Sequence, residues 1–262
     1  MKRFAIFIVL LVFSASCASL RGDVDFLTRQ VTVGENTYGY RVYVPKDRQP
    51  GQKLPVMLYL HGSGSRGSDN RSQIEGFNKF IKENPQNFNF IIVFPQGRAD
   101  TFWDPPMLEQ AVAALDQTVK EFDGDEKRLY VSGWSLGAVG AWHAPLLYPN
   151  KFAAVVPIAG RVLPIDIELA DSSPQILALA NSEKPYEAVA EKLKDTPIWV
   201  FHGGKDMSVP VNESREMNKA FKKIGNPNFH YTEYEGMGHY SVEAAFTTPE
   251  LFEWLSQQRL KE

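Results

Sequence analysis

A serine between two glycines is the first feature of this sequence that could do chemistry. Residues 131–138 read VSGWSLGA, so Ser135 has glycines two positions before it and two positions after it. This Gly-x-Ser-x-Gly pattern, where a strand becomes a helix, is typical of a tight turn that exposes a nucleophilic hydroxyl. Side chains at 133 and 137 would collide with the neighbouring strand and helix, which explains the glycines. Ser135 is therefore the candidate nucleophile.

A nucleophilic serine needs a base and an acid, and two later loops supply them. Residues 198–206 (IWVFHGGKD) are an apolar run and a glycine turn that ends at Asp206, and residues 235–240 (EGMGHY) place His239 between glycines and an aromatic residue. In acyl transfer the imidazole takes the serine proton and the carboxylate orients the ring. The chain order Ser135, Asp206, His239 is the order of Gly-x-Ser-x-Gly hydrolases. We predict these three as the catalytic triad; the alternative for Asp206 is a cap of the helix that follows.

The chain has five histidines, and His239 alone is both C-terminal to Asp206 and on a glycine-flanked loop. The others are assigned no catalytic role. His61 and His202 lie where strands end and are expected to support the loops that follow. His143 and His230 lie on a helix and a strand and are expected to be bystanders.

Acyl transfer also needs backbone N–H groups that bind the oxyanion of the tetrahedral intermediate. The N–H of Leu136, directly after the nucleophile, is the first candidate. Residues 61–67 (HGSGSRG) follow an apolar run and predict the second donor, the N–H of Ser63. The alternative for this loop is a flexible connector.

Other chemistries find less support in the sequence. No histidines or carboxylates show a ligand spacing such as H-E-x-x-H, so we predict no metal site. The net charge is −3, which offers no basic excess to attract nucleic acid.

The elements that must position these groups follow from the apolar periodicity. Strands and helices alternate, which predicts an α/β fold with a mostly parallel sheet, helices on both faces and an antiparallel N-terminal hairpin. Strands are expected at 30–33, 38–44, 55–60, 88–94, 128–132, 152–158, 198–201 and 229–234. Helices are expected at 72–83, 106–122, 136–147, 186–193, 212–224 and 251–259.

Residues 1–17 differ from the rest. Two basic residues precede an apolar stretch and then small residues, as in an export signal. Cys17 is the only cysteine, and the run Ser14-Ala15-Ser16-Cys17 resembles a bacterial lipoprotein box. We predict an exported protein held at a membrane surface in a bacterial envelope by lipid on Cys17. The alternatives are a periplasmic or secreted protein cleaved near Ala18, or a membrane anchor helix.

Successive blocks resemble the α/β-hydrolase superfamily, in particular prolyl-oligopeptidase-like and phospholipase/carboxylesterase-type exported bacterial esterases. They include LPVMLYLHGSGSRGSDN, RLYVSGWSLGAVGAW, KLKDTPIWVFHGGKD and YTEYEGMGHYSVEAAF, and the similarity runs over 54–255. The resemblance implies the triad and oxyanion donors named above, and no cofactor. Because no composition break or linker divides the chain, we expect one catalytic domain over 18–262. Members of the group include acetyl- and feruloyl-type carbohydrate esterases.

Two departures from the family pattern concern the substrate. Trp134 stands beside the nucleophile where the family usually has leucine. The segment 161–184 is longer than the usual connection and is expected to form a cap; the alternative is a surface elaboration. With Phe102, Trp103 and Trp134, it is expected to shape the substrate pocket.

The sequence thus predicts a serine carboxylic-ester hydrolase that acts on a small-molecule or carbohydrate ester, with acetyl and feruloyl esters as candidates. One alternative is a prolyl-oligopeptidase-like serine peptidase, although a β-propeller like that of oligopeptidases would not fit in this length. The other is a surface-anchored binding protein without activity.

Overall fold

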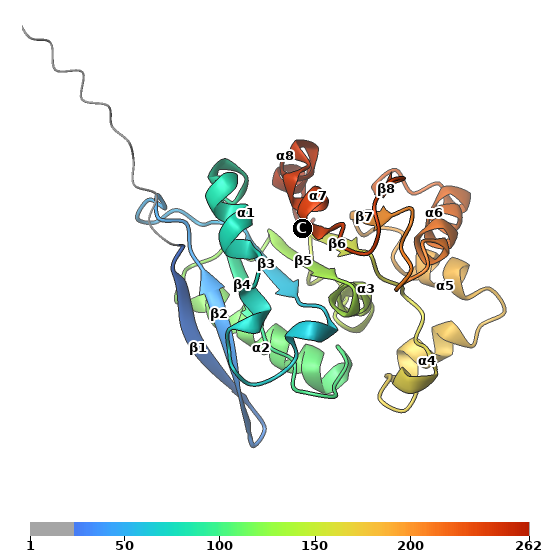
Figure 1. Cartoon of the computed structure of the whole chain (residues 1–262), viewed down its shortest axis with the longest axis horizontal. Coiled ribbons are helices and arrows are strands. Elements are labelled where there is room, and N and C mark those ends of the chain that lie inside the picture. Colours follow the sequence, from blue (N-terminus) through green and yellow to red (C-terminus); the bar gives the residue numbers. More distant parts are fainter. Residues whose placement is uncertain (1–23, 262) are drawn as a thin grey trace, which may run out of the picture.

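The fold is an eight-stranded sheet between two layers of helices (Figure 1). The computed structural model describes residues 24–261, so the expected export signal and Cys17 lie outside the described residues. The strand order is β1-β2-β4-β3-β5-β6-β7-β8. β1 pairs antiparallel with β2, and β2 with β4, whereas the remaining pairs are parallel. This arrangement confirms the predicted fold class.

The strands are β1 (Phe26–Val33), β2 (Asn36–Tyr43), β3 (Val56–Leu60), β4 (Ile91–Pro95), β5 (Leu129–Trp134), β6 (Ala154–Ile158), β7 (Ile198–Gly203) and β8 (Phe229–Tyr234). The α-helices are α1 (Phe77–Glu83), α2 (Pro105–Glu121), α3 (Leu136–Leu147), α4 (Pro174–Ala180), α5 (Pro185–Lys192), α6 (Asn212–Ile224), α7 (Val242–Thr247) and α8 (Pro249–Gln257). Short 3-10 helices include η1 (Ser63–Ser65), η2 (Ser72–Ile74) and η4 (Asp166–Glu168).

The central strands are continuous apolar runs because both of their faces are covered. In β3, Val56 and Leu58 belong to the core that contains residues of α2, α3, α5 and α6, whereas Met57 and Tyr59 belong to the core that contains residues of α1, α7 and α8. Successive side chains of a strand point to opposite faces of the sheet, so one apolar strand contributes side chains to both cores. The parallel strands all end at one edge of the sheet, and the loops after β3, β5, β7 and β8 meet there.

The structure corrects the predicted helix over 72–83. It is divided into η2 and α1, because Gly76 between them has φ +85° and cannot continue a right-handed helix. β4 also begins at Ile91, later than predicted, because Pro85–Asn87 form a 3-10 helix and the pairing with β3 begins at Ile91. The sequence analysis did not predict α4 and α7.

Candidate active site

Ser135 lies on a strained turn between β5 and α3. Its backbone has φ +56° and ψ −119°, a conformation that L-residues rarely adopt and that costs about 1–3 kcal/mol. The glycines around it have no room for a side chain. A Cβ on Gly133 would lie 2.1 Å from the carbonyl oxygen of Gly137, and a Cβ on Gly137 would lie 1.9 Å from that of Leu60. The turn therefore has the shape that the sequence pattern predicted.

The structure brings the three predicted triad residues together. His239 Nε2 lies 2.8 Å from Ser135 Oγ, and His239 Nδ1 lies 2.8 Å from Asp206 Oδ2. Asp206 follows β7 and His239 follows β8, and these loops touch: a Cβ on Gly203 would lie 2.1 Å from the Gly238 carbonyl oxygen. Because a carboxylate only accepts hydrogen bonds, His239 Nδ1 carries a hydrogen, and its Nε2 is left to accept the hydrogen of Ser135.

The Asp206 carboxylate is held as an anion although its side chain is fully buried. Burial alone would raise its pKa. Hydrogen bonds from His239 and from the N–H groups of Val209 and Ser208 outweigh the burial and lower the pKa of Asp206 below its ordinary value. A charged acceptor at this place stabilises the imidazolium that forms when His239 takes a proton.

Two residues next to the nucleophile are the first residues of short or long helices. Leu136 is the first residue of α3 and Ser63 is the first residue of η1, and the first N–H groups of a helix have no partner within it. The loop before Ser63 touches the elbow, since a Cβ on Gly62 would lie 3.5 Å from Ser135 Cβ. The predicted oxyanion donors thus lie on two elements that meet at the serine.

The loop after β3 is rigidly anchored. His61 is buried; its Nδ1 lies 2.7 Å from the Gly62 carbonyl oxygen, and its Nε2 accepts the N–H of Gly97 at 2.9 Å. Burial lowers the pKa of His61 to about 4, so the ring is neutral at neutral pH. Gln96 donates to the Ser65 carbonyl, 3.1 Å away. His61 is therefore the loop support that the sequence predicted, and the loop is not a flexible connector.

Trp103 corrects one expectation. It was expected to line the substrate pocket, but only 2% of it is exposed and its Nε1 donates to the His61 carbonyl at 3.0 Å. It packs under α3, where a Cβ on Gly140 would lie 2.5 Å from Trp103 Cβ. Trp103 thus supports the loop of residues 61–67, whereas Phe102 beside it is partly exposed.

Trp134 lies beside His239. Its Nε1 donates to the His239 carbonyl at 2.9 Å, and its ring lies 5.0 Å from the ring of His239 and 5.0 Å from that of Tyr240. The residue before the nucleophile therefore ties the elbow to the loop that carries the base. Its ring also lies against the oxyanion loop, since a Cβ on Gly62 would come within 2.9 Å of it.

Replacing Trp134 with phenylalanine should keep the packing and remove the hydrogen bond to the loop of His239. The His239 carbonyl keeps the N–H of Ser241 as a donor, so the loss is modest, about 1 kcal/mol or roughly five-fold in kcat/KM. Steady-state kinetics on a nitrophenyl ester measure it. Equal kcat/KM values for the variant and the wild type would show that this hydrogen bond does not position the base.

A buried ion pair joins two residues near the start of the segment 161–184. Arg161, three residues after the end of β6, donates to Glu168, which is 3% exposed. Asp104, at the amino end of α2, is also buried, and one of its carboxylate oxygens has no hydrogen-bond partner. Burial, and then the charges of Glu168 and Asp171, raise the pKa of Asp104 to about 7.

Replacing Asp104 with asparagine should therefore stabilise the fold at pH 8 and change little near pH 4. A carboxyl whose pKa is higher in the folded than in the unfolded state binds more protons when folded, so its cost appears as the pH rises from about 4 to about 7 and is complete above. At about 1.4 kcal/mol per pH unit the upper limit is about 4 kcal/mol, reduced by up to about 1 kcal/mol because the helix terminus favours the anion. Urea unfolding at both pH values measures the difference. A difference of the same size at both values would contradict the assignment.

The other three histidines lie away from the reacting hydroxyl. His143 is buried on α3 with its Nε2 2.9 Å from the Val162 carbonyl oxygen, and His230 packs on the edge strand between Trp199 and Trp254. His202 is fully buried beneath Asp206. The sequence analysis gave it no partner beyond its own loop.

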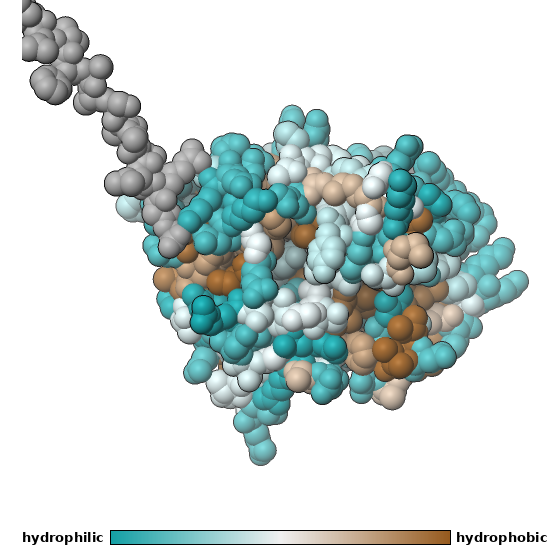
Figure 2. Space-filling view, viewed as in Figure 1, coloured by the Kyte–Doolittle hydropathy of each residue, from teal (hydrophilic) through white to brown (hydrophobic). Residues whose placement is uncertain are grey.

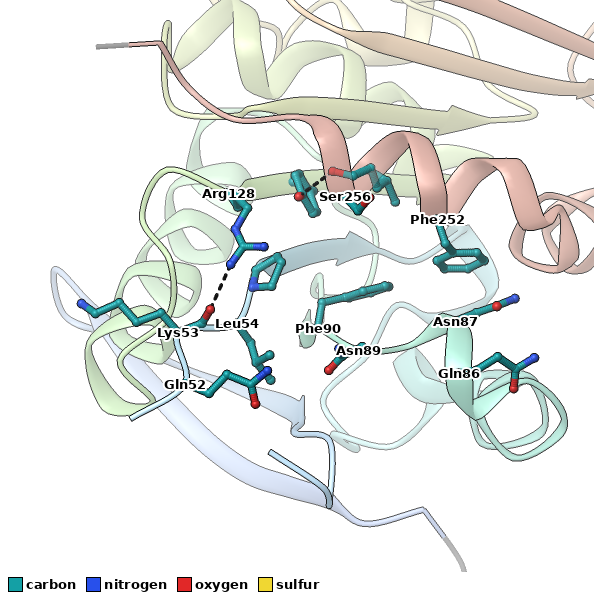
Figure 3. A pocket seen from close by; sticks show the side chains of 13 residues that line it. Gln52, Lys53, Leu54, Gln86, Asn87, Asn89, Phe90, Arg128, Phe252 and Ser256 are labelled. Carbon is teal, nitrogen blue, oxygen red and sulfur yellow. Dashed lines mark hydrogen bonds between the residues drawn. The ribbon is translucent and has the colours of Figure 1, made fainter. Parts of the chain in front are cut away.

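A separate hollow lies at the opposite edge of the sheet. Figure 3 shows it between the residues that lead into β3, the start of β5 and α8, with the rings of Phe90 and Phe252 on one side. Arg128 closes one side by donating to the Lys53 carbonyl. None of its lining residues belongs to the triad loops.

Residues 24–261 hold neither a group of metal ligands nor a membrane-spanning helix. No three histidine, cysteine or carboxylate side chains in this range are grouped as they would be around a metal ion. Within the same part of the chain, no helix combines the length and the apolar character that a membrane span requires.

Comparison with known proteins places the chain among hydrolases. A sequence model of the prolyl oligopeptidase family matches residues 102–258, the part that holds Ser135, Asp206 and His239. An uncharacterised secreted protein of Arthroderma benhamiae is 26% identical over 217 residues, which cover 74% of this chain and 22% of that protein. A bifunctional acetylxylan esterase/xylanase of Neocallimastix patriciarum is 26% identical over 176 residues, which cover 63% of this chain and 21% of that protein. The matches thus span about a fifth of the length of these two relatives.

A solved structure is also similar over most of the chain. The crystal structure of a thermostable esterase superposes with a TM-score of 0.74 at 30% identity, covering 90% of this chain and 63% of that one.

Proposed function

Because the chain belongs to the prolyl oligopeptidase family, we propose that it is a serine hydrolase that cleaves carboxylic esters through an acyl-enzyme. The observation that carries the proposal is the hydrogen-bonded chain from Ser135 Oγ through the His239 ring to Asp206, with both links at 2.8 Å. The positive φ of Ser135, which directs its hydroxyl toward His239, supports the proposal further.

In the proposed mechanism, Ser135 Oγ attacks the ester carbonyl as its hydrogen passes to His239 Nε2. The N–H groups of Ser63 and Leu136 hold the oxyanion, and each such donor is worth about 3 kcal/mol in the transition state. His239 then gives its proton to the leaving alcohol. A water molecule then attacks the carbonyl of the acyl-enzyme while His239 takes its proton, and His239 returns the proton to Ser135 Oγ as the acid leaves.

We propose acetyl or feruloyl esters of carbohydrates as the substrates. The acetylxylan esterase/xylanase among the relatives supports this class. The large apolar residues most exposed within residues 24–261 stand on the loops after β6, β7 and β8: Ile165, Ile167, Leu169, Met207 and Tyr240. Figure 2 shows apolar surface gathered beside α4. We propose that segment 161–184, with Phe102 and Trp134, forms the wall against which the acyl group or the sugar packs.

A panel of substrates tests the proposal: nitrophenyl esters of increasing chain length, methyl ferulate, acetylated xylan and a peptide nitroanilide. We expect turnover of short esters and of at least one carbohydrate-linked ester, with little cleavage of the amide. Faster cleavage of the amide would favour the peptidase alternative. A folded protein that cleaves no ester and no amide, yet binds xylan, would favour the binding-protein alternative.

We also propose that the protein is exported and anchored by lipid on Cys17. The apolar stretch and the small residues before Cys17 support this, as does the secreted relative. Replacing Cys17 with alanine should move the protein from the membrane pellet to the soluble fraction of a bacterial host and abolish labelling by radioactive palmitate. Membrane association and labelling that survive the substitution would mean that Cys17 is not the site of lipid attachment.

A further inference from the structure

A second histidine lies directly beneath the acid of the triad. His202 is the fifth residue of β7 and is fully buried. Its Nε2 lies 3.1 Å from the Val209 carbonyl oxygen and 3.2 Å from Asp206 Oδ2, and its Nδ1 lies 2.7 Å from Ser214 Oγ on α6. Both neighbours of Nε2 are acceptors, so Nε2 carries a hydrogen.

The charge of the His202 ring depends on whether Nδ1 also carries a hydrogen. Burial lowers the pKa of His202, although Val209 and Asp206 act in the opposite direction, so the ring is neutral at neutral pH. Nδ1 of a neutral ring with a hydrogen on Nε2 is an acceptor, and the Ser214 hydroxyl donates to it. Ser214 is itself buried, so this hydrogen bond selects one tautomer and one ring orientation.

His202 acts on one oxygen of Asp206 through Val209 and lies directly beside the other oxygen. Oδ1 accepts the N–H groups of Ser208 and Val209 at 2.8 and 2.9 Å. The carbonyl of Val209 in turn accepts from His202, so the histidine closes the loop that holds Oδ1. At Oδ2 its N–H lies beside the oxygen that receives the hydrogen of His239.

We propose that His202 is a positioning residue for acyl transfer: its Nε2–H fixes the Asp206 carboxylate in the rotation that orients His239. The inference rests on the proposed function. His202 holds the Val209 segment that binds Oδ1, and its Nε2–H also lies 3.2 Å from Oδ2, so the carboxylate is restrained at both oxygens and the hydrogen bond to His239 keeps its direction as the ring gains and loses a proton. His202 touches neither substrate nor the reacting atoms and acts only through Asp206.

Three variants test the role. His202→Leu removes the donor at similar size. His202→Gln keeps an amide N–H three bonds from Cβ, where Nε2 stands in histidine, and Ser214→Ala removes the donor that sets the tautomer. The matched control is His143→Leu, another buried imidazole with one hydrogen bond to a carbonyl, which belongs to neither the triad nor its loops. For each, active sites are counted by fluorophosphonate titration, and kcat and KM on nitrophenyl acetate are expressed per titrated site.

We expect His202→Leu to lower kcat per site about ten-fold with KM nearly unchanged, the equivalent of one hydrogen bond to a charged group. His202→Gln should recover most of that loss, and Ser214→Ala should fall between His202→Leu and the wild type. The control should lose thermal stability only. If His202→Leu yields too little folded protein, the order of the other two variants and the wild type carries the test.

Two results would count against the inference, and they are distinguishable. An active wild type whose His202 and Ser214 variants keep full kcat per titrated site would assign His202 to packing alone and leave the proposed function intact. A wild type that cleaves no ester would overturn the proposed function, and the inference with it.

Discussion

Replacing Ser135 with alanine should lower kcat on nitrophenyl acetate by about 10⁴- to 10⁶-fold, because the nucleophile of a triad cannot be replaced by the remaining two members. His239 would still lie 2.8 Å from Asp206, but its Nε2 would face a methyl group. The measurement is the initial rate at enzyme concentrations high enough to detect slow turnover, together with loss of fluorophosphonate labelling. KM is not informative at such rates.

The control for this variant is Ser135→Gly, which removes the same hydroxyl and also relieves the backbone. Since the serine has φ +56°, glycine should stabilise the fold, and the gain net of glycine's own entropy is about 1 kcal/mol. Both variants should be inactive while only the second is more stable than the wild type in urea unfolding. If Ser135→Ala keeps more than a tenth of the wild-type rate, Ser135 is not the nucleophile.

Replacing Gly137 with alanine should prevent the native fold or destabilise it by more than about 4 kcal/mol, at the extreme of single substitutions. A Cβ there would lie 1.9 Å from the Leu60 carbonyl oxygen and 2.8 Å from that of His61. This backbone cannot retreat, because β3 pairs with β4 on one side and β5 on the other. Yield of soluble protein and the midpoint of urea unfolding measure the effect.

A matched substitution separates this clash from a general cost of losing a glycine. A Cβ on Gly236 would have no atom within 4 Å, and the φ of this glycine is not positive, so Gly236→Ala should unfold near the wild-type midpoint. Equal midpoints for Gly137→Ala and Gly236→Ala would mean that the elbow can relax, and the steric explanation of its glycines would be wrong.

The local patterns of this sequence were sufficient for the fold class. Continuous apolar runs such as 55–60 can be buried only if both faces of the strand are covered, and alternation with amphipathic helices then favours a parallel sheet. Strand ends in such a sheet share one edge, so the order of three polar loops was enough to group Ser135, Asp206 and His239. The break at Gly76 was missed because periodicity continues across it although the backbone conformation does not.

The sequence by itself thus determined the fold class, the elbow and the three candidate triad residues, since each has a local pattern: apolar periodicity, the spacing of glycines around a serine, and polar residues directly after strands. Only the tertiary structure decided the surroundings of those residues, such as Trp103 beneath the loop of residues 61–67 and Trp134 on the carbonyl of His239. These contacts join loops from different strands, and their partners depend on which side chains fill the space once the strands are paired. Packing between distant segments has no local signature, so no spacing in the chain could predict it.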